Sequence, residues 1–313
     1  MIVSMRKKLS MKRLKVEHCK RKIKIKNKSL DKKIFMSQKD NIINLFNIVL
    51  DNMEINDINL EIRITDCETL LTKGNVIGDA SYTYRKKKHI IVLTPNLIED
   101  YHNGYIHDLE LSIIHELSHL YDFYMLSKYK KIKFNPYVDK NKTEEDAIFE
   151  LGYFFWTEFN AYRECFKFEK EFDYHTTFQI INKIHEIKEK DKLIKKLFKE
   201  EDSNVFNEAE EYKKIIDSFI YYFARYLAGI IFGKKKYYKY SEKNLASKEY
   251  KKIEKLDYGL SIRIVKMFSN RYGKYYYKRI YNIGSYILKN IYNDFGIFLK
   301  KINKKICYLK ELD

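Results

Sequence analysis

The sequence predicts an α+β protein, in which a small antiparallel or mixed sheet packs on one amphipathic helix and a mainly α-helical C-terminal region follows. Two observations predict the sheet: residues 58–64 alternate between apolar and polar, and the stretches 81–84 and 89–93 have the pattern of a hairpin. The third observation concerns the helices. After Phe172 the apolar residues recur almost throughout at helical spacing, in a chain of 313 residues with two prolines.

The N-terminal segment is strongly basic. The chain has a net charge of +18, and residues 1–33 hold fourteen of its Lys and Arg residues against Glu17 and Asp31. Residues 22–26 alternate like a strand, but no neighbouring pattern anchors their register. We therefore expect residues 1–33 to form a flexible basic arm, which either contacts nucleic acid nonspecifically or is simply solvated.

The first predicted helix spans residues 38–53, with Ser37 as its N-cap and a broad apolar face. The strand at 58–64 comes next. In the hairpin that follows, the four consecutive cations 85–88 form the tip, and His89 is interpreted as the start of a strand rather than as a ligand.

The most informative stretch is a helix predicted over residues 109–127, which contains the pattern His-Glu-x-x-His. Residues four apart lie on one face of a helix, so His115 and His119 can direct two imidazole nitrogens at one point. Imidazole nitrogen is a common zinc ligand, and Glu116 can reach a water at the same centre as a general base. An apolar stripe nearly opposite the histidines predicts that their face is separate from the core.

A catalytic zinc site needs a third protein ligand. The best candidate is Glu158, on a second helix predicted over residues 144–170, where Thr143 and Asp146 have the pattern of a capping box. Tyr162 lies one turn after Glu158 and is a candidate hydrogen-bond donor to a developing oxyanion.

Neighbouring residues leave alternatives open. Glu150 and Glu164 are rival ligands, and Arg163 is an alternative donor to the oxyanion. Asp122 shares the histidine face and is interpreted as a partner for a histidine N–H. Cys165 is interpreted as a small buried residue near the site.

The two motifs together resemble the gluzincin branch of the zincin metallopeptidases, which have His-Glu-x-x-His followed by a helical Glu-x-x-Ala. The sequences His-Glu-Leu-Ser-His and Trp-Thr-Glu-Phe-Asn-Ala-Tyr-Arg are similar to those of ImmA/IrrE-type metallopeptidases of bacterial genomes and mobile elements. This resemblance, over about residues 40–175, implies that His115, His119 and Glu158 bind Zn2+ and that Glu116 is the base.

The resemblance also implies a zincin-like fold with an edge strand beside the metal helix, to which a peptide substrate pairs. Residues 78–84 are the candidate edge. Residues 34–175 would form the metallopeptidase domain and residues 176–313 the helical C-terminal region, with predicted helices at 178–198, 207–231, 245–269 and 280–303. The expected activity is hydrolysis of a peptide bond in a protein or peptide substrate.

Composition narrows the remaining possibilities. The four cysteines lack CxxC spacing, which argues against a disulfide framework and against a cysteine zinc cluster. The most apolar stretch, residues 215–233, contains Asp217 and Arg225, which favours a core helix over a membrane span. No signal-peptide pattern is visible, so we expect a cytoplasmic protein without a membrane span.

Three other functions stay open at the level of sequence. One is a zincin-fold sensor or regulatory binding protein without catalysis. Another is a nucleic-acid-associated protease that finds its substrate through the basic arm. The third is an all-helical interaction protein in which the motif is accidental, and this alternative predicts no stoichiometric zinc.

Overall fold

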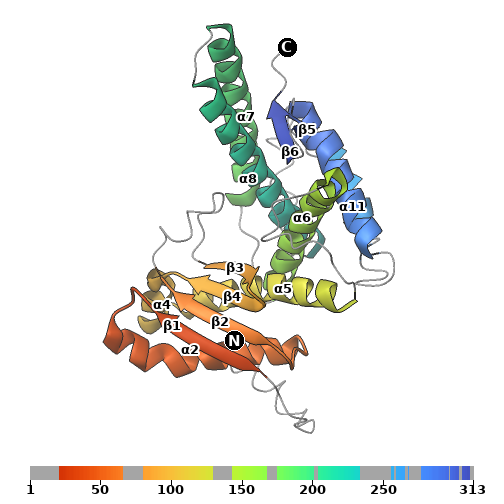
Figure 1. Cartoon of the computed structure of the whole chain (residues 1–313). Helices are drawn as coiled ribbons and strands as arrows, with labels where there is room; N and C mark the ends of the chain where they lie inside the picture. The colour runs from red at the N-terminus through yellow and green to blue at the C-terminus, as the bar shows by residue number, and fades with distance from the viewer. Residues whose placement is uncertain are drawn as a thin grey trace.

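A computed structural model describes residues 21–65, 80–129, 143–167, 175–200, 204–232, 255–256, 259–264, 267, 276–295, 297–302 and 305–310. It shows a mixed α and β protein that is mostly helical and contains a small four-stranded mixed sheet (Figure 1). The α+β class expected from the sequence is therefore confirmed at this level.

The sheet has the strand order β1-β2-β4-β3. Strands β1 (Lys22–Asn27), β2 (Asn59–Ile64) and β4 (Lys88–Leu93) are parallel, and β3 (Ala80–Arg85) is antiparallel to β4. Strand β3 is thus one edge of the sheet, and β1 is the other.

Strand β1 corrects the prediction that residues 1–33 form one flexible arm. Its lysines are exposed, whereas Ile23 and Ile25 are partly buried against the hydrophobic core. The register comes from parallel pairing with β2, which lies more than thirty residues later in the chain, and no local pattern could indicate that pairing. Residues 1–20 of the predicted arm lie outside the described residues.

Helix α2 (Lys32–Asn52) begins earlier than predicted. The side chain of Asp31 accepts hydrogen bonds from the backbone N–H groups of Lys33 and Ile34, at 2.8 Å and 3.1 Å. Asp31 is therefore the N-cap, and Ser37 lies inside the helix, where its hydroxyl donates to the carbonyl of Ile34.

The predicted hairpin of β3 and β4 is confirmed. Lys86 and Lys87 form its two-residue turn and have positive φ angles of 51° and 60°. Positive φ at both positions is typical of the type I′ turn, whose twist matches that of the two strands. The turn leaves four exposed cations at the hairpin tip.

Three helices pack together against one face of the sheet (Figure 1). They are α2, α4 (Pro95–His102) and α5 (Ile106–Tyr129). Apolar residues of β2 and β4, such as Ile62 and Ile91, share one core cluster with residues of these helices. This packing places α5 against the edge strand β3.

Helix α6 (Glu144–Phe166) starts with the capping box that the sequence predicts, because Thr143 and Asp146 bond reciprocally. It packs on α5 and on the later helices α8 (Val205–Phe232) and α11 (Tyr276–Ile287). Helix α7 (His175–Lys199) pairs with α8, and Figure 1 shows these two as a long helical pair.

The end of the chain differs from the helix predicted over residues 280–303. Helix α11 continues as a π-helical segment, η3 (Leu288–Tyr292), and a short 3₁₀ turn, η4 (Asn293–Phe295). Strands β5 (Ile297–Ile302) and β6 (Lys305–Lys310) then pair as an antiparallel hairpin. Pairing with β6 outweighs the helical pattern of the segment that forms β5.

Helices α6 and α11 meet at two glycines. A Cβ atom on Gly152 would lie 2.0 Å from the carbonyl oxygen of Ile280, and one on Gly284 would lie 1.8 Å from that of Ile148. One core cluster includes buried residues from Leu30 to Ile297. Within the described part of the chain, no helix combines the length and the apolar character that a membrane crossing requires.

Candidate metal centre

Helix α5 presents both histidines of the motif on one side and its apolar residues on the other. Ile113, Leu117 and Leu120 are fully buried in the core, as the predicted stripe requires. The histidine side chains remain 13% and 9% exposed, which leaves them accessible from a cavity.

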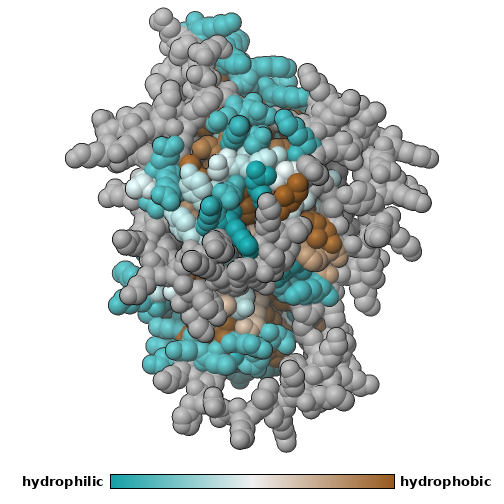
Figure 2. All heavy atoms as spheres, turned by 90° about the vertical axis from the view of Figure 1, so that its right-hand side faces the viewer, coloured by the Kyte–Doolittle hydropathy of each residue, from teal (hydrophilic) through white to brown (hydrophobic). Residues whose placement is uncertain are grey.

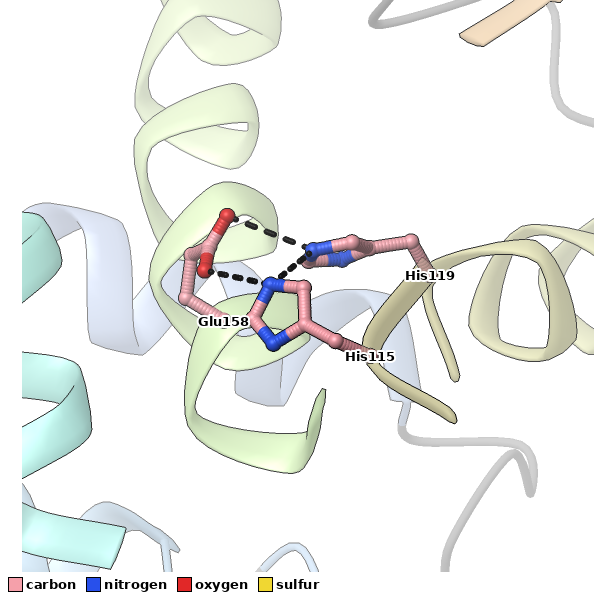
Figure 3. A group of neighbouring side chains, drawn as sticks. All are labelled: His115, His119 and Glu158. Carbon is pink, nitrogen blue, oxygen red and sulfur yellow. Dashed lines mark hydrogen bonds and ion pairs between the residues drawn. The ribbon is translucent and has the colours of Figure 1, made fainter. Parts of the chain in front are cut away.

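Helix α6 places Glu158 opposite the two histidines, and the three side chains point toward one another (Figure 3). The Nε2 atoms of His115 and His119 are 3.0 Å apart. Each Nε2 atom is also 3.4 Å from a carboxylate oxygen of Glu158, Oε2 for His115 and Oε1 for His119. The predicted ligand set is therefore assembled in space.

The two distances to the Glu158 carboxylate suit a shared metal ion better than direct hydrogen bonds, whereas the 3.0 Å between the two Nε2 atoms is also a hydrogen-bond distance. A charge-assisted hydrogen bond between nitrogen and carboxylate oxygen is about 2.7–2.9 Å long, and the observed 3.4 Å separations exceed that range. Bonds of about 2.0–2.1 Å to a tetrahedral ion separate the ligand atoms by about 3.3 Å. Glu158 Oε2 is also buried without a hydrogen-bond partner among the described residues. The group can thus hold a metal ion, and its ligand atoms all lie within 4.8 Å of one another.

The electrostatics of the group also favour a cation. Burial opposes ionisation of Glu158, but the charge of His119 and the two histidine contacts hold its pKa at about 2. Burial likewise opposes protonation of His119, but Glu158, Glu116 and Asp122 together raise its pKa to about 9. The negative charges of these three carboxylates all favour a positive charge at His119.

Glu116 links the metal helix to the edge strand. Its side chain is buried, and the backbone N–H of Tyr82 in β3 hydrogen-bonds to its carboxylate. Burial raises the pKa of Glu116, whereas the neighbouring histidines lower it. The effect of burial is the larger, so the pKa of Glu116 is raised above its ordinary value.

A cavity of about 660 Å³ opens over the three ligand side chains and Glu116. Its walls come from α4, α5, α6 and α8 and from β3, which contributes Ala80, Ser81 and Tyr82. The part of the predicted substrate edge that falls within the described residues, 80–84, therefore belongs to a strand that borders the site.

Tyr162 lies at the same cavity, with its ring 4.8 Å from that of His115 in an edge-on arrangement. Burial raises its pKa above the ordinary value of 10, so the hydroxyl stays protonated and can donate a hydrogen bond. Its hydroxyl contacts that of Tyr221 on α8. The guanidinium of Arg225, also on α8, lies 5.2 Å from the centre of the Tyr162 ring.

Sequence reasoning missed Tyr221 and Arg225 as residues of the site. Both line the cavity, but they lie more than fifty residues after Tyr162. For Arg225 the one available signal in the sequence was a charge inside the apolar stretch 215–233, which also argues against a membrane span.

The rival residues have other roles. Glu164 forms ion pairs with Arg163 and Lys167 and does not line the cavity. The guanidinium of Arg163 lies 6.0 Å from the centre of the Phe232 ring, and Arg163 is not among the described residues that line the cavity. Among the described residues the metal-binding group contains Glu158 and not Glu150.

Asp122 and Cys165 connect α5 with α6. Asn160 donates a hydrogen bond to Asp122 across 2.8 Å, whereas the sequence assigned Asp122 to a histidine N–H. The charge of Asp122 nevertheless acts on His119. Cys165 is buried, as expected, and its thiol lies 3.6 Å from the carbonyl oxygen of Leu111.

Comparisons of the chain with protein-family models, with curated proteins and with solved structures find no match.

Proposed function

We propose that the protein is a zinc-dependent peptidase that hydrolyses a peptide bond in a protein or peptide substrate. The convergence of His115, His119 and Glu158 beside Glu116 carries this proposal. Two imidazole nitrogens and one carboxylate oxygen are a donor set of catalytic zinc, whereas magnesium and calcium prefer oxygen ligands throughout. The cavity above the group offers space for a substrate.

The chain's own residues supply the acid–base chemistry in this proposal. Zinc, when bound, activates water and polarises a carbonyl oxygen. Glu116 takes the proton from the attacking water and passes it to the leaving amine. The Tyr162 hydroxyl donates a hydrogen bond to the oxygen on which negative charge develops, and its contact with Tyr221 orients it.

The edge strand β3 positions the substrate in the same proposal. An extended peptide can add to an exposed sheet edge through main-chain hydrogen bonds, which bind it largely independently of its side chains. Strand β3 is the edge that borders the cavity, and its residue Tyr82 contacts Glu116 directly. A peptide bound there would pass close to the base. This arrangement, like the resemblance to ImmA/IrrE-type enzymes, supports a zincin-like mode of action.

Metal content tests the ligand set. We expect about one zinc per chain in protein purified without chelators or a metal-affinity tag, because catalytic sites bind a single ion through three protein ligands. The His119→Ala and Glu158→Ala variants should lose it. Glu164→Ala is the matched control, because it removes a glutamate of the same helix that pairs with Arg163 and Lys167 and does not line the cavity. Absence of zinc in the wild type after reconstitution would refute the proposal.

Activity tests the role of Glu116 separately. The Glu116→Gln variant should keep its zinc and lose about 10²–10⁴-fold in the cleavage rate of a pool of quenched fluorescent peptides, which is the range for a general base. Zinc binding with equal cleavage in both proteins would remove Glu116 from the mechanism. Zinc binding with no cleavage by the wild type, even of partly unfolded proteins, would favour a regulatory metal-binding protein.

A further inference from the structure

A second cavity, of about 650 Å³, lies on the C-terminal helices and shares no lining residue with the metal centre. Its walls come from residues 262–263 and from one side of α11 and the π-helical segment η3. Figure 2 faces the side of the molecule on which α11 lies in Figure 1, and hydrophilic residues gather there beside smaller apolar patches. We call this cavity the cationic groove.

The groove is lined by cations and neutral polar groups. Arg263, Arg279 and Lys289 contribute three positive charges, and no acidic side chain occurs among its described lining residues. Asp294 affects the pKa of Tyr286, but it is not part of this lining. Three cations lining one concave site make its electrostatic potential positive, which favours the binding of an anion.

The floor of the groove is rigidly built around Tyr286. Its hydroxyl donates to the carbonyl of Lys255 at 3.2 Å, and Gly259 approaches so closely that a Cβ there would lie 1.9 Å from the hydroxyl oxygen. The guanidinium of Arg263 stacks over the Tyr286 ring at 4.1 Å and donates to the Gly259 carbonyl at 2.6 Å. These two contacts hold the Arg263 guanidinium in place. The hydrogen bond uses one of its five N–H groups, which leaves others that can donate to a ligand.

Helix α11 aligns the other donors along the groove. Arg279, Asn282, Tyr286 and Lys289 follow one another at helical spacing and line the same cavity. The backbone changes from α-helical to π-helical at Leu288, just before Lys289. Single π-helical turns occur frequently at functional sites, because they change the direction in which side chains project.

We propose that the cationic groove binds a small anion that carries more than one phosphate group, such as a nucleoside triphosphate. The volume falls in the range of about 300–1,000 Å³ that is usual for small-molecule sites. Guanidinium groups match the oxygen geometry of phosphate, and three cations match a ligand with several negative charges. Asn282 and Ser285 add neutral polar groups along the same wall. This site is independent of the proposed peptidase activity.

Calorimetric titration of the full chain with pyrophosphate and with ATP tests the proposal. We expect both ligands to bind, and we expect affinity to fall at least tenfold in an Arg279→Gln, Lys289→Gln double variant, since each lost charge-assisted contact is worth about tenfold or more. The Asn282→Asp variant is a second test. It should also bind both ligands more weakly, because it puts a negative charge at an exposed position of the groove and removes no packing. Lys278→Gln is the matched control, since Lys278 is an exposed cation of α11 that does not line the groove.

Phosphate ligands also bind metal ions, so the same titrations belong in the His119→Ala variant. Unchanged affinity there places the ligand in the groove, whereas loss of binding places it at the metal centre and overturns the proposal. The proposal is equally wrong if neither ligand binds the wild type at millimolar concentration, or if Lys278→Gln weakens binding as much as the double variant. An oligothymidylate that binds much more tightly than ATP, and loses its affinity in the double variant, would instead assign the groove to nucleic acid.

Discussion

Asn160 on α6 donates a hydrogen bond to the fully buried Asp122 on α5 across 2.8 Å. Asn160 lies two residues after Glu158, and Asp122 lies three residues after His119. The bond therefore fixes the relative position of the two helices next to the site where their ligands meet. The two residues are 38 positions apart in the chain, so no local sequence pattern indicates this contact.

Replacing Asn160 by Ala should destabilise the fold and loosen the metal centre together. The loss of a donor to a buried carboxylate costs about 1–3 kcal/mol of unfolding free energy, and support of this kind affects metal affinity by about 10–100-fold. Urea denaturation and zinc competition with a chelator measure the two effects. The exposed Asn282→Ala variant should change neither, and an Asn160→Ala protein with wild-type stability would show that the bond contributes nothing.

Replacing Gly152 by Ala should destabilise the protein through the contact between α6 and α11. The added Cβ would meet backbone atoms at 2.0 Å and 2.7 Å, which cannot move without separating the two helices. Overpacking of this kind costs about 1–3 kcal/mol. Chemical denaturation provides the measurement, with the exposed Ser285→Ala on α11 as the control. Equal stabilities of the two variants would mean that the helices separate easily.

His89 should make the stability of the protein depend on pH. Burial lowers its pKa to about 4, against an ordinary value of 6.5 in the unfolded chain, and its ring is hydrogen-bonded to Tyr82. The unfolded state therefore takes up the proton first as the pH falls. The contribution of His89 is fully present above pH 6.5 and is lost as the pH falls toward 4, by about 2 kcal/mol between pH 7 and pH 5.

Denaturation at pH 7 and pH 5 in the wild type and in a His89→Gln variant isolates this effect, because the other histidines titrate in both proteins. Glutamine keeps a polar partner for Tyr82. The wild type should lose more stability than the variant over this interval. Parallel losses in both proteins would show that His89 titrates normally.

Zinc should stabilise the folded chain in proportion to its affinity. A ligand that binds only the native state at one hundred times its Kd adds about 2.7 kcal/mol to the unfolding free energy. Thermal melts with and without zinc should therefore separate for the wild type and for Glu164→Ala. They should coincide for Glu158→Ala, because it removes a ligand. A zinc-dependent shift that survives Glu158→Ala would place the ion elsewhere.

Replacing Tyr162 by Phe should lower turnover and leave zinc content unchanged. The hydroxyl is the group proposed to donate to the developing oxyanion, and removal of one such donor costs about 10²–10³-fold in kcat. Tyr221→Phe should have a smaller effect, because Tyr221 acts by orienting Tyr162. If Tyr162→Phe changes KM alone, the hydroxyl binds substrate and does not stabilise the transition state.

Several features follow from local sequence. The spacing of His115 and His119 places them on one helix face, and the capping box at Thr143 starts α6 where the sequence predicts it. The hairpin of β3 and β4 also follows from local alternation. These elements depend on helical periodicity, capping and strand patterning, which act over a few residues.

The tertiary structure decided the rest. Of the three candidate glutamates on α6, it placed Glu158 beside the histidines, because the Asn160–Asp122 bond and the packing of α6 between α5 and α11 set which face of α6 meets them. It also brought Tyr221 to the site and gave β1 a register in the sheet. Each of these outcomes joins segments more than thirty residues apart, and such contacts depend on the packing of the whole core rather than on the pattern of any one segment.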